Sequence, residues 1–271
     1  MTPAPTPTEN GRATQLPRSF IGKEQKVFGL YDDADLYDLV SPPDDAMERF
    51  YVEAVGGHGR KVLELACGSG RFTIPLAKSG AQITGGDLSE TMLEKARERA
   101  NTSGVDVQFV KLDMRDFELD TLFDSVLIAA NSLLHMHTAE DFAQAFGAIR
   151  RHLAPGGVLA FDIFVPSARM LSMPATARQL VGKFSHPELG EISVQETISY
   201  NPVTQVSQAD WYWSTPTQPE FRRTTVHMRQ LYPQELPLLL QHNGFTLVSR
   251  LGNFDGEPLD AQSWRQVCLC Q

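Results

Sequence analysis

One acidic residue and two glycines stand close together at the end of an apolar run. Residues 62–72 read VLELACGSGRF, with Glu64 among aliphatic residues and with Gly68 and Gly70 just after them. Glycine lets the backbone approach a ligand without a side chain in the way. Glu64 either orients the turn and attracts positive charge on a ligand, or only accepts hydrogen bonds from backbone amides of the turn. The pattern indicates a nucleotide site between a strand and a helix.

The kind of nucleotide is narrowed by the residues that follow the turn. A dinucleotide site needs a third glycine at the position of Thr73, and a Walker-type loop needs Gly-Lys-Ser/Thr at the start of the helix. Neither condition is met. What remains is Glu64, the glycine turn and a second acid, Asp87, which ends the next predicted strand. Asp87 can accept both hydroxyls of a ribose. The set suits a ligand with a ribose and a cationic amino-acid end.

Strands and helices are predicted to alternate from residue 61 to residue 166. Short apolar runs suited to burial on both faces predict an α/β fold with a doubly wound, parallel, Rossmann-like sheet. The carboxyl ends of its strands then meet at one edge, where ligands bind. The predicted strands are residues 61–67, 81–87, 105–113, 122–131 and 158–164, and the predicted helices are residues 71–80, 90–101 and 138–152.

After Pro166 the pattern changes to period two, which is typical of antiparallel strands. An antiparallel β insertion is therefore expected over residues 167–231, after the fifth strand of the sheet, as a lid or a dimerisation surface. The remaining residues, 232–271, return to the main domain. The segments concerned are the strands 191–200, 204–214 and 220–232, then the helix 232–245 and the strands 246–252 and 266–271.

Composition and charge exclude several classes of partner. The formal net charge of −9 argues against a general polyanion binder, because phosphate contacts need clustered Lys and Arg. Three cysteines, Cys67, Cys268 and Cys270, imply no disulfide framework and favour a reducing cytoplasm. Residues 1–20 are rich in Pro and Thr, lack the apolar region of a signal peptide and predict a disordered tail. We expect a cytoplasmic protein that binds neither nucleic acid nor membrane.

Four segments in order resemble the class I S-adenosylmethionine-dependent methyltransferases. They are VLELACGSGRFTIPLA, ITGGDLSETMLEKAR, VKLDMRDF and HLAPGGVLAFDIF, and the resemblance extends from about Lys61 to Pro166. The N-terminal LYDLVSPPDDAMERFY, expected to form a helical cap, and the β insertion are similar to the small-molecule branch, which includes glycine N-methyltransferases and deoxyamino-sugar N-methyltransferases. The resemblance implies that residues 21–166 and 232–271 form the domain that binds S-adenosyl-L-methionine.

The resemblance also assigns roles in binding the donor. Asp87 would bind the ribose, Asp113 with Met114 would hold the adenine, residues 66–70 would pack along the methionine part and Tyr37 would close over the sulfonium. The residues expected to contact the donor are Tyr37, Glu64, Ala66, Cys67, Gly68, Gly70, Asp87, Leu88, Met92, Asp113, Met114, Arg115 and Ala130.

Candidates for acceptor activation follow the strand 122–131. A sulfonium methyl is already activated, so such an enzyme mainly aligns the reacting atoms, and a base helps only if the acceptor loses a proton. Asn131 starts a run, N-S-x-x-H, that is similar to one in the glycine-methylating relatives, and His135 ends it. A neutral His135 could take a proton or hold the lone pair of an amine in line, since an ordinary pKa near 6.5 suits that task. Alternatively, His135 is a helix-start histidine bonded to a backbone carbonyl. Tyr37 is a rival candidate, since a phenol over the sulfonium could do the same positioning.

Several other polar and aromatic residues have alternative predicted roles. Asp162 is either structural or faces the mouth of the pocket, and His137 is expected to face solvent. Trp211 and Trp213 share one face of a predicted strand, where they either pack on the core or form a lid or dimer surface over the acceptor. Arg222 and Arg223 are either a solvated edge or an anchor for an acidic group of the acceptor.

Absent motifs narrow the acceptor further. The run Asn-Ser-Leu-Leu stands where enzymes that methylate nucleobase amines have an Asx-Pro-Pro-aromatic motif. The sequence has no carboxylate cluster there that would bind Mg²⁺ and no paired cysteines that would bind zinc. The leading hypothesis is methyl transfer to N or O of a small metabolite by a monomer or homodimer without a metal. The alternatives are methylation of a protein or tRNA, and a non-catalytic regulatory relative that only binds S-adenosylmethionine.

Overall fold

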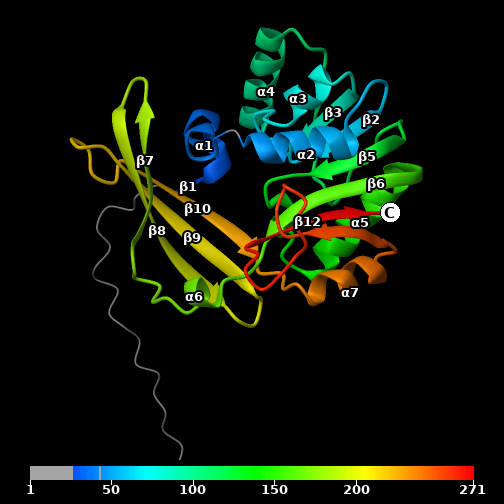
Figure 1. Ribbon diagram of the computed structural model, residues 1–271. Coiled ribbons are helices and arrows are strands. Elements are labelled where there is room, and N and C mark those ends of the chain that lie inside the picture. Colours follow the sequence, from blue (N-terminus) through cyan, green and yellow to red (C-terminus); the bar gives the residue numbers. More distant parts are fainter. Residues whose placement is uncertain (1–26, 43) are drawn as a thin grey trace, which may run out of the picture.

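The computed structural model describes residues 27–42 and 44–271. These residues form two β-sheets, one of seven strands and one of five, with helices packed around them (Figure 1). The tail predicted for residues 1–20 lies outside the described residues.

The seven-stranded sheet has the order β11-β12-β6-β5-β2-β3-β4. Neighbouring strands from β6 to β4 are parallel, and β12 and β11 join antiparallel. This topology confirms the predicted doubly wound, Rossmann-like α/β class. The strands are β2 (Lys61–Leu65), β3 (Gln82–Asp87), β4 (Gln108–Lys111), β5 (Phe123–Ile128), β6 (Leu153–Phe164), β11 (Leu247–Leu251) and β12 (Arg265–Cys270).

Helices cover both faces of this sheet, because neighbouring side chains of each buried strand point to opposite sides. Val62 packs in one apolar cluster with Tyr51 and Leu76, and Leu63 packs in another with Phe146 and Leu240. The first cluster includes α2 (Asp45–Val55) and α3 (Thr73–Lys78), and the second includes α5 (Ala139–His152) and α7 (Glu235–His242). The helix α4 (Glu90–Ser103) packs beside β3 and β4.

Local signals in the sequence account for the ends of these helices. Ser89 accepts the Met92 N–H at the start of α4, and Gly104 ends the helix in the left-handed conformation with φ 66°. Thr138 and Asp141 form a capping box at the start of α5.

The five-stranded sheet, which we call the β-layer, has the order β1-β10-β9-β8-β7. All its pairs are antiparallel except the short β1, which pairs parallel with β10. The three strands predicted between residues 191 and 232 are β8, β9 and β10, whereas β1 and β7 had not been anticipated. A three-residue strand carries no readable period, and the register of β7 shifts between Leu180 and Gly182. The strands are β1 (Val27–Gly29), β7 (Gln179–His186), β8 (Gly190–Asn201), β9 (Val206–Ser214) and β10 (Arg222–Arg229).

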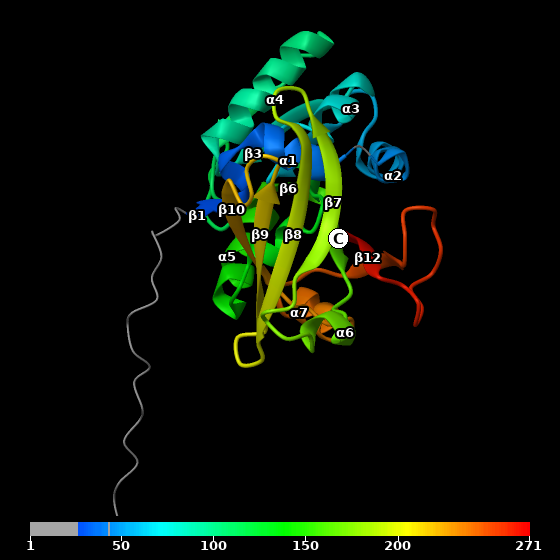
Figure 2. The ribbon, with the colours of Figure 1, turned by 90° about the vertical axis from the view of Figure 1, so that its left-hand side faces the viewer.

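The N-terminal segment lies between the two sheets (Figures 1 and 2). It contains η1 (Leu30–Asp32) and α1 (Ala34–Val40). Leu30 and Leu36 pack against Val194 and Trp213 of the five-stranded sheet, and the Ser89 hydroxyl donates to the Tyr31 carbonyl oxygen at 3.0 Å on the other side. The segment therefore connects the β-layer to the loops at the carboxyl edge of the main sheet.

Two short elements complete the description: η2 (Ser132–His135) follows β5, and α6 (Ala168–Leu171) lies between β6 and β7. Within residues 27–42 and 44–271, no helix is both long and apolar enough to cross a membrane.

Trp213→Ala should destabilise the β-layer strongly. The Trp213 side chain is fully buried and its indole N–H donates to Thr224 Oγ1 at 3.0 Å, so truncation leaves a cavity and an unpaired hydroxyl. We expect a loss of about 3–5 kcal/mol in the free energy of unfolding, measured by urea denaturation. Leu180→Ala, at an exposed side chain of the same sheet, is the control and should change it by less than about 0.5 kcal/mol. Equal effects of the two variants would contradict this packing.

Candidate active site

Two cavities meet at the carboxyl edge of the main sheet. The first, the Asp87 cavity, has a volume of about 690 Å³ and lies against the ends of β2 and β3. The second, the roofed cavity, has a volume of about 920 Å³ and lies between the end of β5 and the inner face of the β-layer. Tyr31 and Tyr37 line both. These two side chains therefore form the boundary between the cavities.

Asp87 ends β3 with its carboxylate fixed by the backbone. One oxygen accepts the Gly68 N–H at 2.8 Å, and the other accepts the Ser89 N–H at 2.8 Å. Burial raises the pKa of Asp87 above its usual value, and the backbone hydrogen bonds oppose that rise. Each carboxylate oxygen keeps a further acceptor position. Asp87 is thus a preorganised acceptor pair at the cavity wall.

The two glycines of the turn have different tasks. Gly68, with φ 56°, faces the Asp87 cavity, and a side chain there would meet only the ring of Tyr37, at 3.9 Å. Gly70, with φ 82°, faces α4, and a Cβ would lie 3.2 Å from the Cβ of Ala96. Gly68 therefore keeps the cavity open, and Gly70 allows close packing of the turn on α4.

Glu64 is buried behind the turn and does not line either cavity. The Thr73 hydroxyl donates to Glu64 Oε2 at 2.5 Å, from the position where a dinucleotide site has its third glycine. Burial raises the pKa of Glu64 to about 8, against the lowering effect of this hydrogen bond and of Arg71. Within the described residues, then, Glu64 ties strand β2 to the start of α3.

The far end of the Asp87 cavity contains a fixed ion pair. Arg115 binds Asp113 at 2.6 Å and also contacts Asp141 at 3.2 Å. The hydrogen bonds from Arg115 lower the pKa of Asp113. Met114 and the exposed Leu88 also line this cavity. These residues form a rim with an acidic group held at a defined place.

Asp162 holds the loop that follows β5. Ala130 and Asn131 both have positive φ angles, 56° and 65°, which non-glycine residues adopt only at a cost. The Ala130 N–H donates to Asp162 Oδ1 at 2.7 Å, and the Tyr51 hydroxyl donates to the same oxygen at 2.6 Å. Arg265 pairs with the other oxygen. Asp162 is therefore a positioning residue beneath the roofed cavity.

Asn131 and His135 do not share a cavity, although they are four residues apart. Asn131 lines the roofed cavity, and its Oδ1 is buried without a hydrogen-bond partner in the part of the chain that the structure describes. His135 lines the Asp87 cavity, where its Nε2 lies 2.7 Å from the hydroxyl of Tyr31. The left-handed Asn131 and the tight turn of η2 separate the two side chains.

Tyr31 is the residue that sequence reasoning missed. Burial lowers the pKa of His135 to about 4 and raises that of Tyr31, so the two groups share one neutral hydrogen bond near pH 7. A histidine with this pKa is a weaker base than a histidine with the ordinary pKa near 6.5, the value expected from the sequence. Through Tyr31 the pair reaches the roofed cavity. The only signal in the sequence was a second tyrosine six residues before Tyr37.

The remaining predicted residues divide into three groups. Ala130, expected at the donor, lines the roofed cavity instead. Cys67 and Met92 are buried, and with Glu64 and Gly70 they line neither cavity because they face the interior behind the turn. The predicted residues that line the Asp87 cavity are Tyr37, Ala66, Gly68, Asp87, Leu88, Asp113, Met114, Arg115 and His135.

The aromatic and basic residues of the β-layer also divide. Trp211 lines the roofed cavity, whereas Trp213 is buried against α1. One face of β9 therefore both lines the cavity and packs on the core. Arg223 pairs with Asp210 at 2.7 Å, and Arg222 pairs with Asp33 of the N-terminal segment. His137 lines the Asp87 cavity rather than facing only solvent. Among residues 27–42 and 44–271, no group of three or more His, Cys, Asp or Glu side chains could hold a metal ion.

Comparison with known proteins finds a methyltransferase domain and similar methyltransferases. Residues 62–157 match the family described as methyltransferase domain. The putative methyltransferase YqeM of Bacillus subtilis (strain 168) is 28% identical over 244 residues, which cover 86% of this chain and 92% of YqeM. The structure of the CcbJ methyltransferase from Streptomyces caelestis superposes with a TM-score of 0.76 at 26% identity, covering 90% of this chain and 98% of CcbJ.

A third relative is known by its substrate. The dTDP-3-amino-3,4,6-trideoxy-alpha-D-glucopyranose N,N-dimethyltransferase of Streptomyces venezuelae is 32% identical over 138 residues, 48% of this chain and 56% of that enzyme. The fold, the Asp87 cavity and the matched domain resemble those of class I S-adenosylmethionine-dependent methyltransferases. The chain contains a methyltransferase domain over residues 62–157, and it resembles the small-molecule branch of the class I methyltransferases, as the sequence predicted.

Asp87→Ala should weaken binding of the donor. The variant removes an anchored carboxylate, and charge-assisted hydrogen bonds of this kind contribute about 1.5–3 kcal/mol, or roughly 10- to 100-fold in affinity. The measurement is calorimetric titration with S-adenosylhomocysteine. Asp106→Ala, at an exposed position before β4 on the opposite edge of the sheet, is the control and should bind normally. Unchanged affinity of Asp87→Ala would remove Asp87 from the donor site.

Glu64→Gln should stabilise the ligand-free protein increasingly as the pH rises. Because the folded-state pKa of Glu64 is raised to about 8, its contribution to stability is fully present below the unfolded pKa and is lost as the pH rises through 8. Relative to the wild type, the variant should gain roughly 2–4 kcal/mol in unfolding free energy between pH 5 and pH 8. Urea denaturation at several pH values measures this gain, and Glu53→Gln, at an exposed position of α2, should show none. A constant difference would place the pKa of Glu64 near its ordinary value.

Proposed function

We propose that this methyltransferase transfers a methyl group from S-adenosylmethionine to N or O of a small metabolite, with an amine nitrogen as the preferred acceptor. The observation that carries the proposal is the junction of two cavities at Tyr31 and Tyr37. A volume of about 920 Å³ beneath the β-layer suits one whole small molecule. A protein or tRNA substrate would instead need an open groove at this edge.

The Asp87 cavity fits the donor by the chemistry of its walls. The fixed Asp87 carboxylate would hold the ribose hydroxyls, and the rim at Asp113 and Met114 would hold the adenine. Bound there, S-adenosylmethionine supplies an activated sulfonium methyl. Tyr37, at the boundary of the cavities, would lie at the sulfonium end. The residues then need to provide alignment more than chemical activation.

Two observations favour an amine. The relative from Streptomyces venezuelae is named as an N,N-dimethyltransferase of an amino sugar. In addition, Tyr31 brings a neutral hydroxyl, shared with a neutral His135, to the boundary of the cavities. An amine attacks only with its lone pair free, so a neutral acceptor of its N–H can orient it without adding positive charge. With its pKa lowered to about 4, His135 acts in this proposal by positioning Tyr31 rather than by storing a proton.

His135→Ala and Tyr31→Phe should each lower kcat by about 10²-fold while leaving donor affinity within a few-fold, because alignment is lost but the Asp87 cavity is intact. The double variant should be little worse than either single variant, since the two residues act as a unit. Single-turnover methyl transfer with an identified acceptor is the measurement, and Tyr232→Phe, at an exposed tyrosine outside both cavities, is the control. Near wild-type rates, or a wild-type kcat inflection near pH 6.5 that His135→Ala removes, would contradict the positioning role.

The proposal as a whole is tested by methyl transfer from tritiated S-adenosylmethionine to amino sugars, other small amines and hydroxylated metabolites, beside bulk tRNA and protein. Incorporation into the small molecules supports the proposal. Incorporation only into tRNA or protein would establish the macromolecular alternative. Tight donor binding without transfer to any of them would support a regulatory protein.

A further inference from the structure

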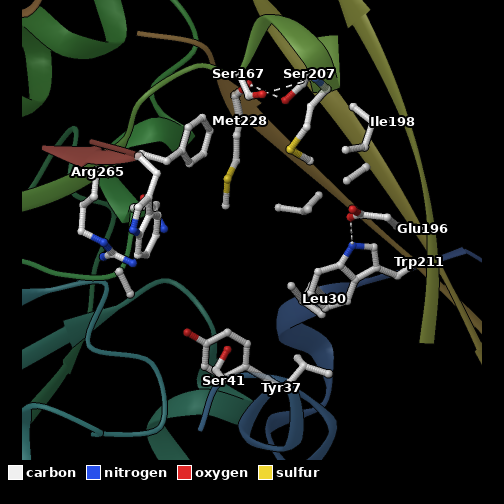
Figure 3. Close-up of a pocket in the computed structure, with 18 of the residues that line it drawn as sticks. Leu30, Tyr37, Ser41, Ser167, Glu196, Ile198, Ser207, Trp211, Met228 and Arg265 are labelled. Carbon is white, nitrogen blue, oxygen red and sulfur yellow. Dashed lines mark hydrogen bonds between the residues drawn. The ribbon is translucent and has the colours of Figure 1, made fainter. Parts of the chain in front are cut away.

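The roof of the roofed cavity contains one carboxylate in apolar surroundings. Glu196 lies on β8 two residues before Ile198, and both side chains point into the cavity beside Trp211 (Figure 3). The other residues of the β-layer that line the cavity are mostly apolar and include Ile198, Ala209, Trp211, Val226 and Met228.

Only one of the two Glu196 carboxylate oxygens accepts a hydrogen bond within the described part of the protein. Its Oε2 accepts the Trp211 indole N–H at 3.1 Å. Across the described ranges, no donor reaches its other oxygen and no cation pairs with it. Burial in the roof raises the pKa of Glu196. A carboxylate in such a place is costly unless a partner donates hydrogen bonds to it.

The cations that line the cavity are already engaged. Arg71 donates to the backbone carbonyl oxygens of Ser41 and Pro42, and Arg265 pairs with Asp162. Arg265 also lies on the opposite side of the cavity from Glu196 (Figure 3). Neither arginine compensates Glu196, so a molecule that displaces water from the cavity has to supply the missing donor.

We infer that Glu196 and Trp211 form a recognition subsite for a second hydrogen-bond donor of the acceptor, a hydroxyl or a protonated amine, separate from the atom that is methylated. The inference rests on the proposed function only in calling the occupant the methyl acceptor. Trp211 fixes the carboxylate through its N–H and adds an aromatic surface to the cavity wall.

The position of the subsite sets the form of the acceptor. Glu196 is in the roof, whereas Tyr37 lies across the cavity from it (Figure 3). The acceptor therefore has two polar groups, one at the boundary with the Asp87 cavity and one at Glu196, joined by an apolar body that contacts side chains such as Ile198 and Met228. A saturated ring with two polar substituents satisfies this description.

The test compares three probes of one shape: cyclohexylamine, trans-4-aminocyclohexanol and trans-1,4-diaminocyclohexane. Their binding to the full chain saturated with S-adenosylhomocysteine is measured by saturation-transfer NMR. We expect the two disubstituted probes to bind at least tenfold more tightly than cyclohexylamine. Equal binding of the three probes by the wild type, or no binding of any, would overturn the subsite.

Two variants identify the group that is responsible. Glu196→Gln keeps an acceptor oxygen and removes the charge, so it should abolish the preference for the diamine and only reduce that for the hydroxyl. Glu191→Gln, an exposed position on the same strand paired with Lys183 at 3.1 Å, should leave all preferences unchanged. A preference that survives in Glu196→Gln and Glu196→Ala would overturn the inference.

The binding readout separates this inference from the proposed function. If the disubstituted probes bind through Glu196 but no small molecule is methylated, the subsite stands and the proposed reaction fails. If small molecules are methylated but Glu196 variants bind the probes as the wild type does, the proposed function stands and the subsite fails. Calorimetric titration with S-adenosylhomocysteine confirms in each variant that the Asp87 cavity is intact.

Discussion

Carboxylates at the ends of the strands hold the loops from which both cavities are built. Asp87 at the end of β3 accepts N–H groups from Gly68 and Ser89, and Asp162 of β6 accepts the N–H of Ala130. Glu64 of β2 is tied to Thr73. The loops after β2 and β5 change direction through non-glycine residues with positive φ, Ala66, Ala130 and Asn131, a costly conformation that persists where surrounding interactions enforce it. Removing water from these groups raises the pKa of all three acids, and their hydrogen bonds oppose that rise.

The β-layer depends on the same edge through the N-terminal segment. In that segment, Asp38 accepts the Ser69 hydroxyl of the turn after β2 at 2.5 Å and pairs with Arg99 of α4 at 2.7 Å. Its other side packs on Val194 and Trp213. The tyrosines at the boundary of the cavities are therefore placed by contacts with both sheets. A shift of the β-layer relative to the main sheet would move Tyr31 and alter its contact with His135.

The two cavities separate what is common to the class from what is particular to this chain. The Asp87 cavity is built from the segments that carry the resemblance to class I methyltransferases, and it lies largely within the matched residues 62–157. The roof of the second cavity comes from residues after that match. Acceptor choice in our proposal therefore resides in the β-layer, where Glu196 interrupts an apolar surface.

The sequence by itself determined the parallel sheet, the glycine turn and the acid at the end of β3. These features depend on local patterns, because strand burial, helix caps and strand ends are properties of neighbouring residues. It also predicted antiparallel strands after Pro166, from their period of two. The short β1 and the irregular β7 were missed, since neither has enough regular residues for a pattern.

The tertiary structure alone decided how the site is assembled. It brought Tyr31 to His135 over 104 residues and Tyr51 to Asp162 over 111 residues. It put Asn131 and His135 in different cavities, gave Glu64 a partner at Thr73 and lowered the pKa of His135. In the sequence, Glu196 is one polar residue of a strand with alternating polarity. In the fold, its side of β8 faces the cavity at the end of β5. Burial and partners depend on contacts between distant segments, and no local pattern in the chain encodes them.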